Sequence, residues 1–297
     1  MKKRHHTIPR CYLQNFTDSD GFVWVLDTKD NIFKTKPENI LVESHFYTVT
    51  LKNGDKSLFV EDTLANIEGT YAAIFEKKIT KNLFLTDEER AKVSVFIAAL
   101  FLRTRPHRES MHRMVLSMKK SMEEWRQRYE DNPEARRIAA ATPSSGKAIH
   151  MSDIEEYLEN YKEEHALSIL AQLPHLSQII FDMKWSIWES PSGGYVTSDD
   201  PIVLLRPEAI KKYGPNAFGS LPGFAYKDVD VTLPLSKNRL LLAGWILERD
   251  SYIGVDSEMM ERMNYRTITH SSERIIGESE SMLKAIRLKY NKTAYKK

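Results

Sequence analysis

Apolar residues change their spacing at Trp185-Ser186-Ile187-Trp188-Glu189, which has the alternating character of a β-strand. Across residues 58–183, apolar positions instead recur every three or four residues, as in helices that bury one face. Short β-rich runs separated by turn residues continue to residue 247, and residues 259–276 and 279–290 return to helical spacing. Helices and strands are therefore segregated along the chain, which favours an α+β fold over a doubly wound sheet.

Two β-rich runs near the start predict a β-hairpin. Phe22-Val23-Trp24-Val25-Leu26 and Ile32-Phe33-Lys34-Thr35 are separated by the turn-forming residues 27–31. We expect this hairpin to join or flank the later strands, and a helical layer to pack on a mainly antiparallel sheet. Residues 1–297 are expected to form a single domain, in which residues 132–147 form a surface loop or a mobile linker.

Two sequence patterns mark helix starts. Thr86-Asp87-Glu88-Glu89 and Ser152-Asp153-Ile154-Glu155 have the spacing of a capping box, in which two side chains satisfy free backbone amides. The first is expected to begin a helix that Pro106 ends or kinks, and the second a helix that Pro174 kinks. Another helix is expected from about residue 107 to residue 129, with a solvated, mixed-charge face.

Composition is that of a soluble globular protein, with 41% apolar and 28% charged residues. The net charge of +2 gives no strong overall preference for nucleic acid. Cys11 is the only cysteine, so an intrachain disulfide is excluded, which fits a reducing cytosol. The first residues lack the apolar run of a signal peptide, and no uncharged apolar stretch is long enough to span a membrane. We therefore expect a cytoplasmic protein.

The opening stretch His6-Thr7-Ile8-Pro9-Arg10-Cys11-Tyr12-Leu13-Gln14-Asn15-Phe16 is unusual for a terminus, because it crowds chemically capable side chains among apolar ones. We expect it either to be tied into the core or to form part of a site. A neutral imidazole at His6 would suit a general base or a metal ligand. The alternative is a histidine bonded to the backbone. His5 follows three basic residues and is expected to be solvated.

Glu61 and Glu68 lie seven residues apart, so a helix places both carboxylates on one side. They could hold a divalent metal, or they could pair with arginines of another helix. Arg103 falls on an apolar helix face, where a guanidinium needs an acidic partner, and Glu61 or Glu68 is the expected one. Arg105 and Arg108 follow, either as an anion-binding cluster or as part of a structural Arg–Glu network.

A second polar cluster is Thr197-Ser198-Asp199-Asp200-Pro201, between two expected strands. Carboxylates at a strand end can project into a cleft and bind a metal. The alternative is a turn in which Ser198 and Asp199 bond to neighbouring backbone amides. The chain carries no glycine-rich phosphate loop, no His-Glu-x-x-His and no Gly-x-Ser-x-Gly pattern.

Several of these patterns occur in the same order in the bacterial family called domain of unknown function 4238, which this chain resembles. The resemblance rests on the opening stretch, Gly21–Asp27, the block from Pro37 to Tyr47 with Glu43, Glu61 with Ile67-Glu68, Arg103-Thr104-Arg105-Pro106 with Arg108, Tyr195–Pro201 and Asn264. It carries no activity. It implies that polar residues distant in sequence belong to one site, namely His6, Asn15, Glu68, Arg103, Asp199 and Asn264.

Our first functional hypothesis is an intracellular hydrolase of nucleic-acid or nucleotide phosphodiesters, of the toxin or phage-defence type. Glu68 and Asp199 would bind Mg²⁺ or Mn²⁺, His6 would act as general base, and Arg103 would stabilise phosphate charge. The expected substrate-binding residues are Asn15, Arg108 and Asn264. A second hypothesis is a non-enzymatic binding or scaffold protein whose polar cluster is structural. A third is a metal-free nucleotide-modifying enzyme.

Overall fold

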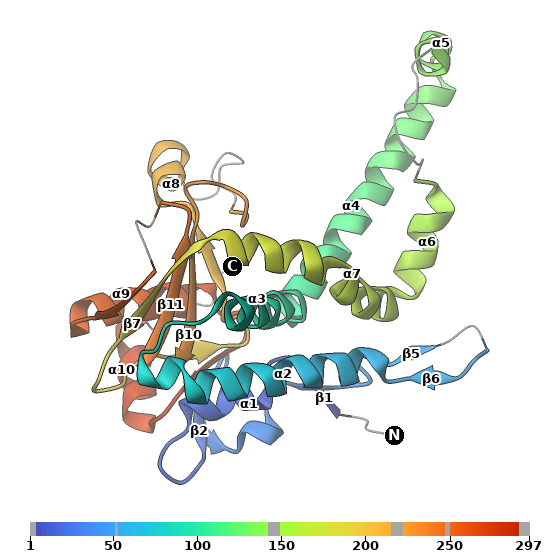
Figure 1. Cartoon of the computed structure of the whole chain (residues 1–297). Coiled ribbons are helices and arrows are strands. Elements are labelled where there is room, and N and C mark those ends of the chain that lie inside the picture. Colours follow the sequence, from blue (N-terminus) through green and yellow to red (C-terminus); the bar gives the residue numbers. More distant parts are fainter. Residues whose placement is uncertain (1–3, 51–52, 142–148, 215–221, 247–249, 291–297) are drawn as a thin grey trace.

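Two mainly antiparallel sheets carry the fold in the computed structural model, which describes residues 4–50, 53–141, 149–214, 222–246 and 250–290 (Figure 1). Only β12 and β7 pair in parallel within the larger, five-stranded sheet. In spatial order that sheet comprises β12 (Ser251–Gly254), β7 (Lys184–Glu189), β11 (Arg239–Gly244), β10 (Asp230–Ser236) and β9 (Val203–Leu205). The strand expected at residues 185–189 is confirmed, and it lies inside this sheet.

The second, four-stranded sheet combines the N-terminal hairpin with strands from late in the chain. Its order is β3 (Ile32–Thr35), β2 (Val23–Asp27), β13 (Arg274–Gly277) and β8 (Thr197–Ser198). The expected hairpin is confirmed as β2 and β3, and it joins later strands through β13. The helix expected over residues 259–276 is wrong at its end, because the backbone of β13 pairs with β2 on one side and β8 on the other.

Shorter elements connect these sheets to the helices. They are β1 (Arg4–His6) paired with β4 (Val42–Ser44), β5 (Val49–Thr50) paired with β6 (Lys56–Ser57), the short helix α1 (Arg10–Leu13), and the 3-10 turns η1 (Gln14–Phe16), η2 (Pro37–Asn39) and η3 (Ile79–Lys81).

The helical layer is formed by three long helices that pack side by side. These are α2 (Phe59–Lys77), α3 (Asp87–Leu102) and α7 (Tyr161–Asp182). The capping box at the start of α3 is confirmed, because the Glu89 amide donates to the Thr86 hydroxyl over 3.2 Å and the Thr86 amide donates to the Glu89 carboxylate over 2.9 Å.

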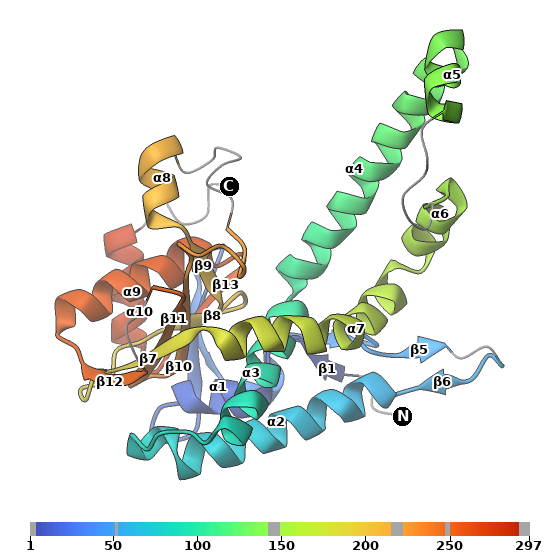
Figure 2. The same ribbon diagram turned by 45° about the horizontal axis from the view of Figure 1, so that its top comes forward.

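Three helices form an arm that extends away from the two sheets (Figure 2). They are α4 (Arg105–Glu130), α5 (Pro133–Ala141) and α6 (Met151–Glu159). The loop or linker expected at residues 132–147 is wrong over residues 133–141, which are helical. Residues 142–147 lie outside the described residues. The second capping box is shifted: Asp153 accepts from the His150 amide, and the expected single helix is divided at Asn160.

The remaining helices follow the β block: α8 (Pro207–Tyr213), α9 (Ser257–His270) and α10 (Glu280–Tyr290). None of the helices within the described residues has the length and apolar character needed to cross a membrane.

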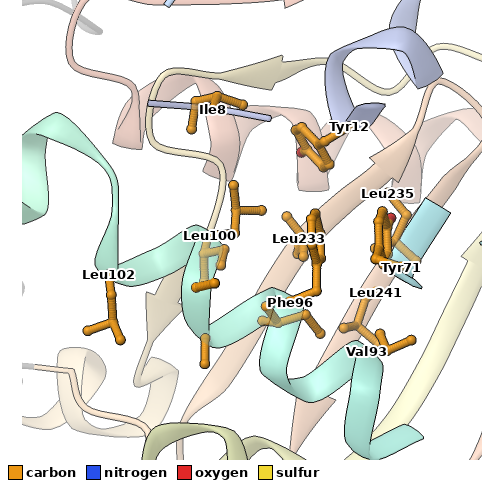
Figure 3. Close-up of a cluster of buried hydrophobic side chains, with 14 of the residues drawn as sticks. Ile8, Tyr12, Tyr71, Val93, Phe96, Leu100, Leu102, Leu233, Leu235 and Leu241 are labelled. Atoms are coloured by element: carbon orange, nitrogen blue, oxygen red, sulfur yellow. The ribbon is translucent and has the colours of Figure 1, made fainter. Parts of the chain in front are cut away.

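The helical layer packs on the five-stranded sheet through apolar side chains that are almost completely buried (Figure 3). Phe96 of α3 stacks on Tyr71 of α2, with ring centroids 3.6 Å apart. Leu233 of β10 and Leu241 of β11 supply the sheet side of this core. Each such side chain contributes about 1.5–3 kcal/mol by burial, so this interface fixes how the helices and sheet are placed.

Tyr12 ties the N-terminal segment into this core. Its hydroxyl donates to the Pro234 carbonyl of β10 over 2.6 Å and lies 2.7 Å from the Thr197 hydroxyl of β8. One side chain therefore connects α1 to a strand of each sheet. Of the two expectations for the opening stretch, the one that ties it into the core is confirmed.

Candidate functional site

The first polar cluster surrounds Arg103, which follows the last residue of α3 and is only 2% exposed. Its Nη1 donates to Glu68 Oε1 over 2.6 Å, its Nη2 to the His6 carbonyl over 2.6 Å, and its Nε to the Tyr47 hydroxyl over 3.0 Å. The expectation that an acid meets Arg103 is confirmed, and Glu68 is that acid. We call these four residues the Arg103 cluster.

Tyr47 and the histidines complete this cluster from the β1 side. The Tyr47 hydroxyl donates to the His6 carbonyl over 3.1 Å. His5 is fully buried, its ring stacks on Tyr47, and its Nδ1 accepts the Tyr47 amide over 2.9 Å. The expectation that His5 is solvated is therefore wrong, because the pairing of β1 with β4 turns its ring inward. Burial alone would lower the pKa of Arg103. The effects of Tyr47 and Glu68 are larger and opposite, so the pKa of Arg103 is raised.

A pocket of about 400 Å³ lies next to this cluster, and we call it the α4 pocket. It is formed where the start of α4 meets β4, the start of α7, the end of β8 and the start of β13. Its lining residues are Thr7, Leu41, Val42, Glu43, Arg105, Arg108, Glu109, Tyr161, Lys162, Asp199, Glu273 and Arg274. Six chain segments thus converge, the sixth being Thr7 after β1. Two predicted site residues, Arg108 and Asp199, line this pocket together.

Arg108 forms a bidentate ion pair in the pocket wall. Its Nη1 and Nη2 donate to the two carboxylate oxygens of Glu43 over 3.0 and 2.9 Å. Its guanidinium also lies 4.3 Å from the centre of the Phe46 ring. Lys162 approaches the same Glu43 carboxylate at 3.8 Å. Of the two interpretations of Arg108, this geometry matches the structural Arg–Glu network. Both residues of the pair nevertheless line the pocket.

Two further arginines line the pocket, and only one of them has acidic partners among the residues that the structure describes. Arg105 is half exposed and pairs with Glu109 over 2.7 Å and with Glu273 over 3.0 Å. The side chain of Arg274 has no hydrogen bond or ion pair within the described part of the chain. Arg274 is therefore the lining cation that is available to an anion from solution.

Asp199 closes the pocket at the end of β8 and is 7% exposed. Its carboxylate accepts the amides of Ser272, Glu273 and Arg274 over 2.9–3.2 Å. Burial raises the pKa of Asp199 to about 6, and these three amides oppose that rise. The carboxyl is held by three hydrogen bonds and has a raised pKa, which are two properties of an acid–base group.

The backbone of the pocket wall is strained at Leu41, whose φ of 51° lies in the left-handed region. A leucine pays about 1–2 kcal/mol for this conformation. The Leu41 carbonyl accepts both the amide and the hydroxyl of Thr7, over 2.8 and 3.1 Å, which holds the conformation in place. Strain of this kind tends to collect at functional sites.

The two predicted asparagines bind backbone groups elsewhere. Asn15 donates to the Leu235 carbonyl over 3.1 Å. Asn264 of α9 accepts the Val196 amide over 3.1 Å and donates to the Gly194 carbonyl over 2.7 Å. Neither asparagine lines the α4 pocket: Asn15 joins η1 to β10, and Asn264 joins α9 to the segment just before β8.

The proposed metal ligands are distributed over both places. Glu68 contacts Arg103 and does not line the pocket that Asp199 lines. Among the described residues, no group of three or more His, Cys, Asp or Glu side chains is placed to hold a metal ion. Binding of Mg²⁺ or Mn²⁺ by Glu68 and Asp199 stays a prediction.

The sequence did not single out some residues of the Arg103 cluster and the α4 pocket as site residues. Arg274 was placed at the end of a helix, so its position in a pocket wall could not be foreseen. Tyr47, Glu43 and Lys162 carry no spacing pattern of their own. The one available signal was the block of the family resemblance that contains Glu43 and Tyr47.

Comparison with known proteins gives one match. A family model described as a protein of unknown function (DUF4238) covers residues 4–281, which include every residue of the Arg103 cluster and the α4 pocket. Searches of curated proteins and of solved structures gave no significant match.

Proposed function

Because the chain belongs to the DUF4238 family, whose description states no activity, we propose from the site alone that it binds and hydrolyses a phosphate ester of the nucleotide or nucleic-acid class in the α4 pocket. The observation that carries this proposal is the lining of that pocket. It combines four cationic side chains and three carboxylates, Glu43, Glu109 and Glu273, with the buried carboxyl group of Asp199, whose pKa burial raises to about 6.

Phosphate binding is supported by the arginines. A guanidinium donates two parallel hydrogen bonds to a phosphate, and Arg274 has no competing acid within the described residues. Arg105 and Arg108 also line the pocket, at the start of α4, although both are paired with acids. The free amides at the start of a helix favour an anion. The volume of about 400 Å³ lies within the range of small-molecule sites.

The hydrolytic step assigns acid–base chemistry to Asp199. At neutral pH its carboxylate would accept a proton from a water molecule, whose oxygen attacks phosphorus as the bond to the leaving oxygen breaks. The arginines would stabilise the charge that gathers on the phosphoryl oxygens. The proton held by Asp199 would then pass to the leaving group. Asp199 thus replaces His6 as the proposed base, because Asp199 lines the α4 pocket and His6 does not.

A non-enzymatic scaffold is the second candidate, and the Arg103 cluster favours it. All three donor positions of that buried guanidinium are used within the protein, as in a structural network. In that case the α4 pocket would bind its anion without turning it over.

The test measures binding and turnover separately. Binding of a fluorescent adenosine triphosphate analogue is followed by anisotropy, and hydrolysis is followed with bis(p-nitrophenyl) phosphate in EDTA, Mg²⁺ or Mn²⁺. We expect Arg274→Gln to weaken nucleotide binding about tenfold, which corresponds to about 1.4 kcal/mol. The control Arg113→Gln removes an exposed cation of the helical arm, away from the pocket lining, and should change nothing.

Asp199→Asn separates the two candidates. If it abolishes turnover while the nucleotide still binds, the hydrolase is supported. Binding without turnover in the unaltered protein would favour the scaffold. Equal nucleotide affinity in the unaltered protein and Arg274→Gln would refute the α4 pocket as the binding site. A metal requirement that Glu68→Gln also abolishes would support the predicted Mg²⁺ or Mn²⁺ site.

A further inference from the structure

A second hollow follows one face of α9, and we call it the α9 groove. Its volume is about 710 Å³, larger than that of the α4 pocket, and the two share no lining residue. β9 and α8 form one wall, and the end of α10 forms the other. The family resemblance singled out none of its lining side chains.

The base of the groove is apolar. Val203 and Leu205 of β9, Ile210 of α8 and Met263 of α9 line it, and Val203 and Met263 are buried. Tyr265 and Tyr290 stand at one end with ring centroids 5.5 Å apart. Apolar walls with a few placed polar groups are typical of sites for small organic ligands.

Two arginines supply the polar groups. Arg266 Nη2 reaches Asp230 at 3.3 Å, but its Nη1 is buried and has no hydrogen-bond partner among the described residues. A buried donor without an acceptor costs about 1–3 kcal/mol. Arg262, one turn earlier on α9, has no ion pair or hydrogen bond with any described residue. Both guanidiniums line the groove, so an anion entering it would meet unsatisfied donors.

The acidic residues nearby leave some donors of these two guanidiniums without a partner. Glu261 is held by Lys289, whose Nζ lies 2.6 Å from its carboxylate. Asp230 contacts only one nitrogen of Arg266. Glu258 lines the groove four residues before Arg262 and forms no ion pair with it. The three cations Arg262, Arg266 and Lys289 are thus matched in number by three acids, but Arg262 and Nη1 of Arg266 have no acidic partner among the described residues and can still donate to an anion.

A smaller hollow of about 160 Å³ extends the groove on the other side of the arginines. Arg262, Met263 and Arg266 line both hollows, and Trp188 and Leu242 add apolar surface in the smaller one. The charged groups thus lie between two apolar regions. This arrangement fits a ligand with an anionic head and an apolar body.

We propose that the α9 groove binds an organic carboxylate with an apolar body, its carboxylate on Arg266 and Arg262 and its body on Val203, Leu205 and Ile210. A carboxylate matches the two parallel donors of a guanidinium. This site is independent of the proposed function, since it uses a different pocket.

The test is calorimetric titration with decanoate below its micellar concentration, with decanol as the uncharged ligand of equal length. We expect decanoate to bind the unaltered protein more tightly than decanol. Arg262→Gln should weaken decanoate binding about tenfold and leave decanol binding unchanged. Arg262 is exposed, so this variant folds normally, and Arg266→Gln provides a second measurement.

Two controls place the binding in the groove. Arg274→Gln alters the α4 pocket and should leave decanoate affinity unchanged, as should Arg113→Gln on the arm. The proposal is overturned if decanoate does not bind, if Arg262→Gln and Arg266→Gln bind it as tightly as the unaltered protein, or if Arg274→Gln is the variant that loses binding.

Discussion

The Arg103 cluster and the α4 pocket are neighbours made of the same residue types, yet they treat charge in opposite ways. Arg103 is 2% exposed, and each of its donor positions has a protein acceptor. Arg274 faces a hollow, and its side chain has no protein acceptor in the described part of the chain. The difference separates arginines that hold the fold from arginines that are free to hold a ligand.

Phe46 lies between the two regions and explains how they stay distinct. Its ring contacts Tyr47 of the cluster edge-on, with centroids 4.6 Å apart, and the guanidinium of Arg108 lies over it at 4.3 Å. His165 of α7 meets the same ring edge-on at 6.1 Å. A buried aromatic ring thus forms a wall of low polarity between the closed cluster and the open pocket.

The largest effect is expected from Arg103→Met, which removes the centre of the closed cluster. Loss of a buried, hydrogen-bonded charge should cost about 3–5 kcal/mol of unfolding free energy, because Glu68 and the His6 carbonyl lose their donor. Urea unfolding measures this. The matched control Arg105→Gln removes a half-exposed arginine and should cost under about 1 kcal/mol. Equal losses in both variants would remove the distinction between the regions.

His165→Phe tests the wall between the regions through pH. Burial, with His107 and Arg108, lowers the pKa of His165 to about 3. A histidine whose pKa is lowered in the folded state contributes to the free energy of unfolding at pH values above its unfolded pKa. That contribution is lost as the pH falls below the unfolded pKa, because the unfolded chain then binds a proton that the folded protein does not. From pH 6.5 to 4.5 the unaltered protein should lose about 2–3 kcal/mol relative to His165→Phe. Parallel stability curves for the two proteins, from urea unfolding at each pH, would contradict this.

Glu68→Gln should have a smaller effect, because the amide oxygen can still accept from Arg103. The charge is lost, so the buried guanidinium faces a neutral partner, but Glu68 is 22% exposed and water screens the change. We expect a loss of about 1–2 kcal/mol, read from the urea midpoint. A loss as large as that of Arg103→Met would mean that the ion pair alone carries the cluster.

Arg274→Gln should have the smallest effect on stability, under about 0.5 kcal/mol, because its side chain has no hydrogen bond or ion pair with a described residue to lose. Thermal unfolding in buffer without phosphate measures this. Added inorganic phosphate should then raise the melting temperature of the unaltered protein more than that of the variant. A strongly destabilised Arg274→Gln would move Arg274 to the structural side of the comparison.

Sequence patterns foretold the elements whose signals are local. The α3 capping box, the β2–β3 hairpin and the apolar periodicity of α2 and α3 all depend on residues close together in the chain. β13 was not predicted, because these four residues after a helix form a strand only by pairing with β2 and β8. The same dependence on distant partners concealed the inward turn of His5.

The candidate site was foreseen in part for a similar reason. An arginine on an apolar face demands an acid, so the partner of Arg103 could be predicted by electrostatics, although the choice between Glu61 and Glu68 could not. Nothing in the spacing of Asn15 and Asn264 showed that backbone groups would engage them. Convergence of Arg108 and Asp199 at one pocket depends on the three-dimensional path of six chain segments.

The central place of β13 bears on how the chain is synthesised. β2 and β3 leave the ribosome early, but Asp27 pairs with Arg274, close to the other end of the sequence. Until that late segment emerges, β2 keeps an edge without its partner, and such edges pair readily with other chains. Closure over so long a loop is also slow. The nascent protein therefore exposes an aggregation-prone strand edge that the finished fold covers.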